Sequence, residues 1–166
     1  LGPSLASLLL SFSNYNVIRD PVFVGSQNYV RAFTIDNLFY PSLARTFYYA
    51  FVFVPASILS SLSLALLLNF NLRGRTIFRA MFFLPSLVPM VAAVVLWLSL
   101  LQPNWGIVNS TIRSLGLPAP NWFGDPRWAV PSLILISLWT TVGGTRMVII
   151  LAGLQGVPEE LYDAAS

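Results

Sequence analysis

Long stretches without charge constrain the fold of this chain more than any other feature of its sequence. No charged residue lies between Arg45 and Arg73 or between Arg79 and Arg113, and the stretch 129–154 holds only one. A helix needs about 20 apolar residues to cross the roughly 30 Å hydrocarbon core of a bilayer. The apolar runs are continuous rather than alternating, which disfavours the strands of a membrane barrel. We therefore predict an all-α, polytopic transmembrane helical bundle, a single domain with complete spans at 47–70, 80–101 and 129–154.

The overall composition supports a lipid environment and excludes several functions. Of the 166 residues, 56% are hydrophobic and only 9% are charged, whereas about 25% of a soluble domain is charged. The basic residues are scattered apart from Arg73, Arg75 and Arg79, so we expect no nucleic-acid partner. The chain has no Cys and no His, which excludes thiolate and imidazole metal sites and Ser-His or Cys-His nucleophiles. We predict no catalytic residue, no metal and no cofactor.

Both ends of the sequence look like interior points of a longer protein. The first residues, 1–12, form an apolar run that is too short to span a bilayer and has no basic region before it. We expect this run to be the end of a first span. The last residues, 156–166, have the pattern of a helix that is just beginning.

Charge in the connecting segments predicts the orientation of the spans. The short connector 69–79 holds three arginines and no acidic residue, so the positive-inside rule places it in the cytoplasm. The longer connectors, 13–45 and 102–128, then lie outside, and the segment after Leu154 returns to the cytoplasm. Tryptophans near the predicted span ends fit an aromatic belt at the membrane surface: Trp105, Trp122 and Trp128.

Prolines and serines inside the predicted spans have two interpretations each. Pro55, Pro85 and Pro89 either kink helices for packing or act as gating hinges. We favour packing for Pro55 and leave both roles open for the other two. For a group of serines in the second span, we favour close helix packing over pore lining. These serines are Ser57, Ser60, Ser61 and Ser63.

The end of the sequence carries the strongest functional pattern. Gly153 and Gly156 can end the last span, and Pro158 suits the first position of a new helix. Acidic residues in a first helical turn are favoured by the helix dipole. Helical spacing places Leu161, Tyr162 and Ala165 close together on one apolar face. An ordinary helix lying on the membrane is the alternative, but anionic lipid would repel its acidic first turn. The residues concerned are Glu159, Glu160, Leu161, Tyr162, Asp163, Ala164 and Ala165.

This segment resembles the EAA loop of the permease subunits of ATP-binding-cassette (ABC) importers. The family pattern is roughly Leu-Gln-x-Ile-Pro-x-Glu-Leu-Tyr-Glu-Ala-Ala, followed by Asp-Gly-Ala. Asp163 stands where the family usually has Glu, and the sequence stops before the Asp-Gly-Ala. The matching residues are Leu154, Gln155, Val157, Pro158, Glu160, Leu161, Tyr162, Ala164 and Ala165.

The resemblance extends over nearly the whole chain. The stretch 24–29 is similar to the family's Gly-x-x-Asn-Tyr, and 73–85 is similar to its short inner loop entering the next span. Further family positions are occupied by Trp97, Gly106, Asn109, Trp122, Phe123 and Trp139. The ordered set is similar to sugar-type permeases of binding-protein-dependent ABC importers, such as the maltose and glycerol-phosphate permeases.

What the resemblance implies is a division of labour among several proteins. Two permease subunits, the same or different, would form the pathway in the bacterial plasma membrane. Two cytoplasmic ATPase subunits would bind the helix at 158–165, and an extracytoplasmic solute-binding protein would deliver the solute. This chain has no Lys to complete a Walker-type phosphate loop, so we expect the ATPase to be a separate protein.

The last predicted span contains the candidate solute pathway. Polar groups inside a membrane span usually face protein or a water-filled cavity. Two adjacent glycines would leave room beside the helix, and Thr and Trp can contact sugar hydroxyls and sugar faces; close helix packing is the alternative for each. Arg146 needs a partner or water, and it could select an anionic solute, reach the membrane surface or pair with another subunit. The candidates are Trp139, Thr140, Thr141, Gly143, Gly144 and Arg146.

Two other functional classes compete with a permease subunit. An ATP-independent channel or secondary transporter would use similar spans without a coupling helix. A membrane enzyme would need catalytic groups within the bilayer, and no acidic residue lies within a predicted span. The solute itself stays open among sugars, polyols, glycerol phosphate and other small polar molecules.

Overall fold

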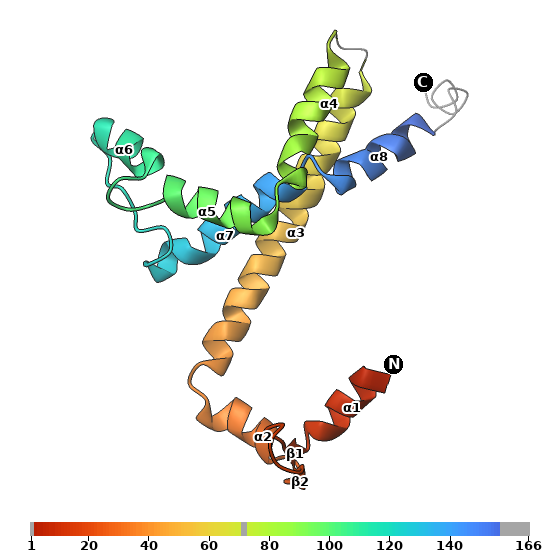
Figure 1. Ribbon diagram of the computed structural model, residues 1–166, viewed down its shortest axis with the longest axis vertical. Coiled ribbons are helices and arrows are strands. Elements are labelled where there is room, and N and C mark those ends of the chain that lie inside the picture. Colours follow the sequence, from red (N-terminus) through yellow and green to blue (C-terminus); the bar gives the residue numbers. More distant parts are fainter. Residues whose placement is uncertain (1, 71–72, 157–166) are drawn as a thin grey trace. The chain divides into compact units, whose positions relative to one another are not determined.

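The computed structural model describes residues 2–70 and 73–156 of the chain. It divides into two compact units, Leu1–Phe47 and Tyr48–Ser166, whose helices are labelled in Figure 1. Almost all regular structure is helical, apart from one pair of two-residue strands. The prediction of an all-α chain is confirmed.

The first unit is a short helix followed by a compact loop region. Helix α1 (Gly2–Leu10) leads to strands β1 (Ser13–Asn14) and β2 (Val22–Phe23), which pair antiparallel. Helix α2 (Gln27–Val30) and the π-helical turn η1 (Arg31–Ile35) follow. The side-chain amide of Asn28 donates to the carbonyl oxygens of Ser11 and Ser13, at 2.8 and 3.1 Å, and Tyr29 shares a hydroxyl hydrogen bond with Ser11. These contacts give the Asn-Tyr pair a physical role, because they fasten α2 to the end of α1.

Helix α3 (Phe39–Asn69) is the longest element, with 31 residues. It begins at Phe39, before the predicted span start at Phe47, because a charge such as Arg45 marks the edge of an apolar run without breaking a helix. Pro55 lies inside α3 and does not end it. In the described part of the chain, α3 is the one helix that is long and apolar enough by itself to cross a membrane.

The stretch 80–101, treated above as one span, is divided in the structure. Helix α4 (Arg75–Phe83) continues into the 3-10 helix η2 (Leu84–Leu87), and α5 (Met90–Leu100) leaves at 95°. The break lies at Val88 and Pro89. Val88 has extended backbone angles, as expected for a residue that precedes proline, and Pro89 has no N–H to continue the helical hydrogen bonds.

The stretch 129–154 is also bent. Helix α6 (Ile107–Ser114) belongs to the preceding connector, and α7 (Pro126–Thr141) is followed by α8 (Thr145–Gln155) at an angle of 49°. Helix α8 runs through Gly153 and ends at Gln155 with Gly156 as its C-cap, so Gly156 ends the helix and Gly153 does not. Each bent pair is long and apolar enough for a span only if its two helices are taken together. Three complete spans therefore stay a prediction.

The core of the second unit lies between α3 and α8 (Figure 1). Leu64, Ala65 and Leu68 of α3 are buried against Met147 and Leu151 of α8. Hydrogen bonds add to this packing: the Ser61 hydroxyl donates to the carbonyl oxygen of residue 142 at 3.0 Å, and the Tyr49 hydroxyl donates to Ser137 at 2.9 Å. Tyr49 of α3 thus contacts α7, and the last turns of α3 pack against α8.

Candidate functional site

The predicted coupling segment lies outside the residues that the structure describes. This applies to Pro158, Glu159, Glu160, Leu161, Tyr162, Asp163, Ala164 and Ala165. The last described residue is Gly156, the cap of α8. The proposed contact with an ATPase therefore stays a prediction.

The predicted solute pathway falls at the bend between α7 and α8. Trp139, Thr140 and Thr141 form the last residues of α7, the two glycines lie in the link, and Arg146 is in the first turn of α8. The link is packed against η2 and the end of α4. The bend therefore brings α7, α8, η2 and the end of α4 together at one place.

The two glycines of the link bring backbones together instead of leaving open space. A Cβ atom at Gly143 would overlap the carbonyl oxygen of Phe82, and one at Gly144 would lie 3.0 Å from Cβ of Ser86. Both glycines are buried. The expected room beside the helix is thus filled by α4 and η2, which supports the packing interpretation for Gly143 in particular.

Cavities lined by described residues surround the bend and divide the predicted pathway residues among them. Thr140 and Thr141 line both a cavity of about 310 Å³ and a more polar one of about 210 Å³. Trp139 and Gly143 line a separate, mostly apolar cavity of about 530 Å³. The structure therefore groups the threonines with Gly144 and Arg146, whereas Trp139 faces a different space. The lining of the polar cavity is Ser86, Thr140, Thr141, Gly144, Thr145 and Arg146.

The threonine hydroxyls have a defined hydrogen-bonding polarity. Thr140 and Thr141 both donate to the carbonyl oxygen of Ser137, at 3.0 and 2.6 Å. A hydroxyl carries one donor and two acceptor lone pairs, so these side chains are left with acceptors to offer. Such groups suit a solute that brings its own O–H donors.

Trp139 is held by a second tryptophan. Its ring lies edge-on to Trp97 of α5, with centroids 5.5 Å apart. The indole nitrogen of Trp97 is buried without a hydrogen-bond partner among the described residues. From the sequence, Trp97 was expected only to occupy a family position. Its contact with Trp139 was not predicted, because the two residues are 42 positions apart in the sequence.

Arg146 is oriented by residues of α3. Its Nη1 donates to the hydroxyl of Ser57 at 2.5 Å, and its guanidinium carbon lies 5.7 Å from the ring centroid of Phe53. Ser57 is fully buried and donates in turn to the carbonyl oxygen of Val54 at 2.9 Å. A guanidinium over an aromatic face is stabilised by cation–π attraction. Ser57 and Phe53 are thus supporting residues for this site, a role that neither sequence interpretation of Ser57, helix packing or pore lining, had included.

The connector between α5 and α7 forms a separate hydrogen-bonded cap. Asn109 of α6 is buried, and its amide donates to the carbonyl oxygens of Pro103 and Pro120 at 3.2 and 3.0 Å. Its side-chain oxygen accepts from the indole N–H of Trp122 at 2.7 Å. A Cβ atom at Gly106 would lie within 2.6 Å of three backbone atoms, so only glycine fits there. Three of the family positions therefore act together to fix this connector.

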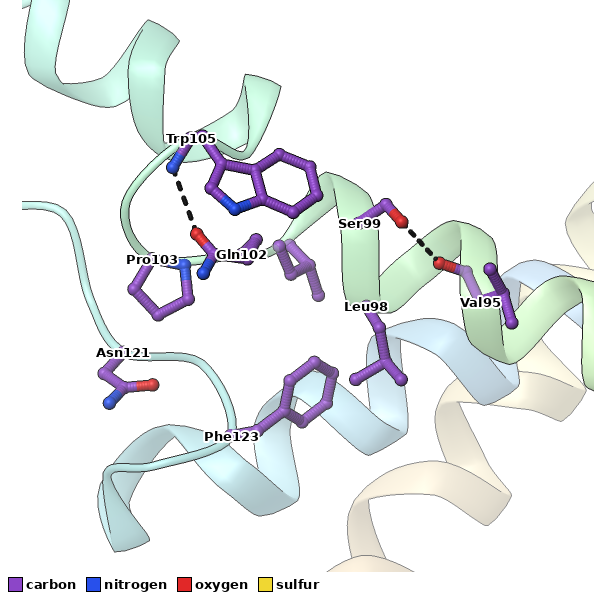
Figure 2. A pocket seen from close by; sticks show the side chains of 9 residues that line it. Val95, Leu98, Ser99, Gln102, Pro103, Trp105, Asn121 and Phe123 are labelled. Atoms are coloured by element: carbon purple, nitrogen blue, oxygen red, sulfur yellow. Dashed lines mark hydrogen bonds between the residues drawn. The ribbon is translucent and has the colours of Figure 1, made fainter.

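An apolar pocket of about 380 Å³ lies between the end of α5 and this connector. Figure 2 shows Leu98 and Phe123 at one side of it, with Trp105 and Gln102 opposite. Gln102 accepts backbone hydrogen bonds from Asn104 and Trp105, at 2.6 and 3.0 Å, and so fixes the turn after α5. The pocket is distinct from the polar cavity at the bend.

The start of α7 is fixed by a charge pair. The Asp125 carboxylate caps the helix by accepting from the backbone N–H of Arg127 at 2.9 Å, and it pairs with the Arg127 guanidinium at 2.8 Å. The side-chain hydrogen bond from Arg127 is the main cause that holds the pKa of the Asp125 carboxyl below its usual 3.8. This arrangement agrees with Asp at an N-cap and Pro at the first helical position.

Comparison with known proteins identifies the family. No family model matches the chain, but several curated proteins do. The probable ABC transporter permease protein YesP of Bacillus subtilis (strain 168) is 35% identical over 99% of this chain. The lactose transport system permease protein LacF of Rhizobium radiobacter is 34% identical over 99%, and the trehalose/maltose transport system permease protein MalF of Thermococcus litoralis is 32% identical over 89%. The chain belongs to the sugar-type ABC importer permeases. It spans about half the length of these relatives, 53% of YesP and 50% of MalF.

The fold of the permease agrees with this assignment. A chain of a bacterial ABC transporter involved in the import of the acidic polysaccharide alginate superposes with a TM-score of 0.81 at 21% identity, covering 99% of this chain and 55% of that one. The helical fold is therefore that of ABC importer permeases, and membership of the permease family places the chain in the membrane. The prediction of a sugar-type ABC importer permease is confirmed. The relatives carry the names of transport permeases, not of enzymes.

Proposed function

We propose that the full-length permease forms half of the translocation pathway of an ATP-driven importer for a sugar or a similar small polar solute. A second permease subunit, the same or different, would complete the pathway. Two ATPase subunits would bind from the cytoplasm, and an extracytoplasmic binding protein would deliver the solute. In this role the permease conducts the solute and couples its passage to ATP hydrolysis, which the ATPase subunits carry out.

The observation that carries the proposal is the position of α8. One end of this helix begins at the polar bend with Arg146, and the other ends at Gly156, immediately before the segment that matches the coupling pattern. Its 11 residues correspond to about 16 Å at 1.5 Å per residue. A helix of this length packed on α3 can transmit a push from the tail to the bend as a rigid element.

The bend itself supports passage of a hydroxyl-rich solute. Thr140 and Thr141 offer acceptor lone pairs to a cavity, and η2 and α5 line the other side of it. Four of the curated relatives are named for trehalose and maltose, lactose, diacetylchitobiose, and xylose and arabinose. A sugar is therefore the solute class that we propose for this permease.

The test is reconstitution of the full-length protein in lipid with candidate ATPase and solute-binding subunits. We expect co-purification, and ATP hydrolysis that rises when trehalose, maltose or another panel sugar is added with the binding protein. Tyr162→Ala should abolish this stimulation, because the tail would lose its apolar anchor. Tyr15→Ala, at an exposed position of the first unit, is the matched control and should keep full stimulation.

Two results would contradict the proposal. Full coupling in the Tyr162→Ala protein would remove the tail from the mechanism. Uptake of solute by the permease with no ATPase bound would instead favour an ATP-independent channel or secondary transporter. Thr141→Leu tests the pathway separately, and we expect it to impair uptake while leaving co-purification with the ATPase intact.

A further inference from the structure

The polar cavity at the bend brings a cation together with hydroxyl acceptors. Its volume is about 210 Å³, the share of several water molecules. Arg146 supplies the charge, and a neighbouring hydroxyl on η2, Ser86, donates to the carbonyl oxygen of Phe83 at 2.7 Å. Like the two threonines, Ser86 therefore keeps its acceptor lone pairs for a ligand.

The guanidinium of Arg146 has capacity beyond its contacts within the chain. Arg carries five N–H donors and no acceptor. Within residues 2–70 and 73–156, its one hydrogen bond goes to Ser57, and no carboxylate pairs with it. Asp125, the one acidic residue described in the second unit, is paired with Arg127 instead. Ser57 and Phe53 fix the orientation of Arg146 without neutralising its charge.

From this arrangement we infer that the cavity takes an acidic saccharide, with the anionic group on Arg146 and the sugar hydroxyls on Ser86, Thr140 and Thr141. The inference rests on the proposed transport of sugars and deepens it. A neutral sugar would leave the Arg146 donors facing hydroxyl oxygens, which accept more weakly than a carboxylate. A carboxylate from a second subunit would satisfy the charge but would bring no donors for the three hydroxyl acceptors. An acidic saccharide supplies both an anion for Arg146 and hydroxyl donors for Ser86, Thr140 and Thr141.

The experiment compares two saccharides that differ by one carboxylate. The assembled full-length permease in lipid nanodiscs is titrated with cellobiose and with cellobiouronic acid, and tryptophan fluorescence reports binding. We expect cellobiouronic acid to bind about tenfold more tightly or better, the range expected for one hydrogen-bonded charge pair. Arg146→Gln should remove the preference and Arg146→Lys should keep part of it. Arg127→Gln, at an exposed ion pair outside the cavity, should keep it in full.

Several outcomes would overturn the inference. Equal binding of the two saccharides by the unmodified protein, or binding of neither at millimolar concentration, would contradict the role of Arg146 as an anion site for a saccharide. A preference that survives Arg146→Gln would place the anion elsewhere. Because the titration needs no ATP, failure of ATPase coupling would contradict the proposed function while leaving the saccharide preference measurable. If Arg146→Gln does not assemble, the comparison in the unmodified protein and in Arg146→Lys decides the matter.

Discussion

Gly143 provides a sharp test of the packing at the bend. A Cβ atom there would overlap the carbonyl oxygen of Phe82, lie 2.5 Å from its carbonyl carbon and lie 3.0 Å from its Cβ. Two of these three atoms are backbone, so α4 as a whole must move to admit a methyl group. Overpacking of a close contact typically costs about 1–3 kcal/mol. We expect Gly143→Ala to destabilise the permease by this amount.

Gly153 supplies the matched control, because the same substitution there meets no obstacle. It lies inside α8, and an added Cβ would have nothing within 4 Å among the described residues. Replacing a helical glycine by alanine at an open position stabilises by roughly 0.5–1 kcal/mol. The two Gly→Ala variants should therefore shift stability in opposite directions, although both add one methyl group to the same bent pair of helices.

The assay is the apparent melting temperature of the full-length protein in detergent, followed by tryptophan fluorescence. One kcal/mol corresponds to about 2–4 °C for domains of 150–250 residues and to less for longer chains, so the two variants should differ measurably in melting temperature, with Gly143→Ala lower. If Gly143→Ala melted at or above Gly153→Ala, the contact between the link and Phe82 would be refuted. Glycine at 143 would then owe its presence to function at an open pathway.

Three further predictions concern other parts of the second unit. Asn109→Ala should destabilise the connector by roughly 1–3 kcal/mol, because it removes the hydrogen bonds to the carbonyl oxygens of Pro103 and Pro120 and leaves the indole N–H of Trp122 unpaired; limited proteolysis of the connector should speed up. Ser61→Ala removes a buried hydrogen bond to the α7–α8 link, so the melting temperature should fall by the equivalent of about 1 kcal/mol. The pKa of Asp125 is lowered mainly by Arg127, so its stabilisation is complete above the unfolded pKa and is lost as pH falls through the folded value. Asp125→Asn should therefore flatten the acid side of the stability profile, and an unchanged profile would contradict this assignment.

The arrangement around Arg146 could not be predicted from the sequence. Arg146 and its hydrogen-bond partner Ser57 are 89 residues apart, and no local pattern joins them. The sequence predicted that Arg146 would need a partner or water, because a charge in a membrane span is costly. It did not indicate that the partner would be a buried serine of α3, nor that Trp139 would face a cavity separate from the threonines.

The sequence indicated one of the two helix breaks but not the other. Pro85 and Pro89 suggested a kink or a hinge, and the 95° turn lies at Pro89. The 49° bend after α7 has no proline in its link, residues 142–144. Its geometry comes from the contact of Gly143 with α4, which depends on a residue about 60 positions earlier and is not a local propensity.

The sequence by itself determined that the chain lies in lipid, that its structure is helical, and which family it belongs to. Exclusion of charge from hydrocarbon acts on each residue separately, and a motif of adjacent residues is read without knowing the fold. Only the tertiary structure decided that Phe82 fills the space beside Gly143, that Ser57 holds Arg146, and that four hydroxyl side chains share a cavity with this cation. These features arise where segments distant in sequence meet, and packing between such segments is fixed by the shape and hydrogen-bonding needs of both partners at once.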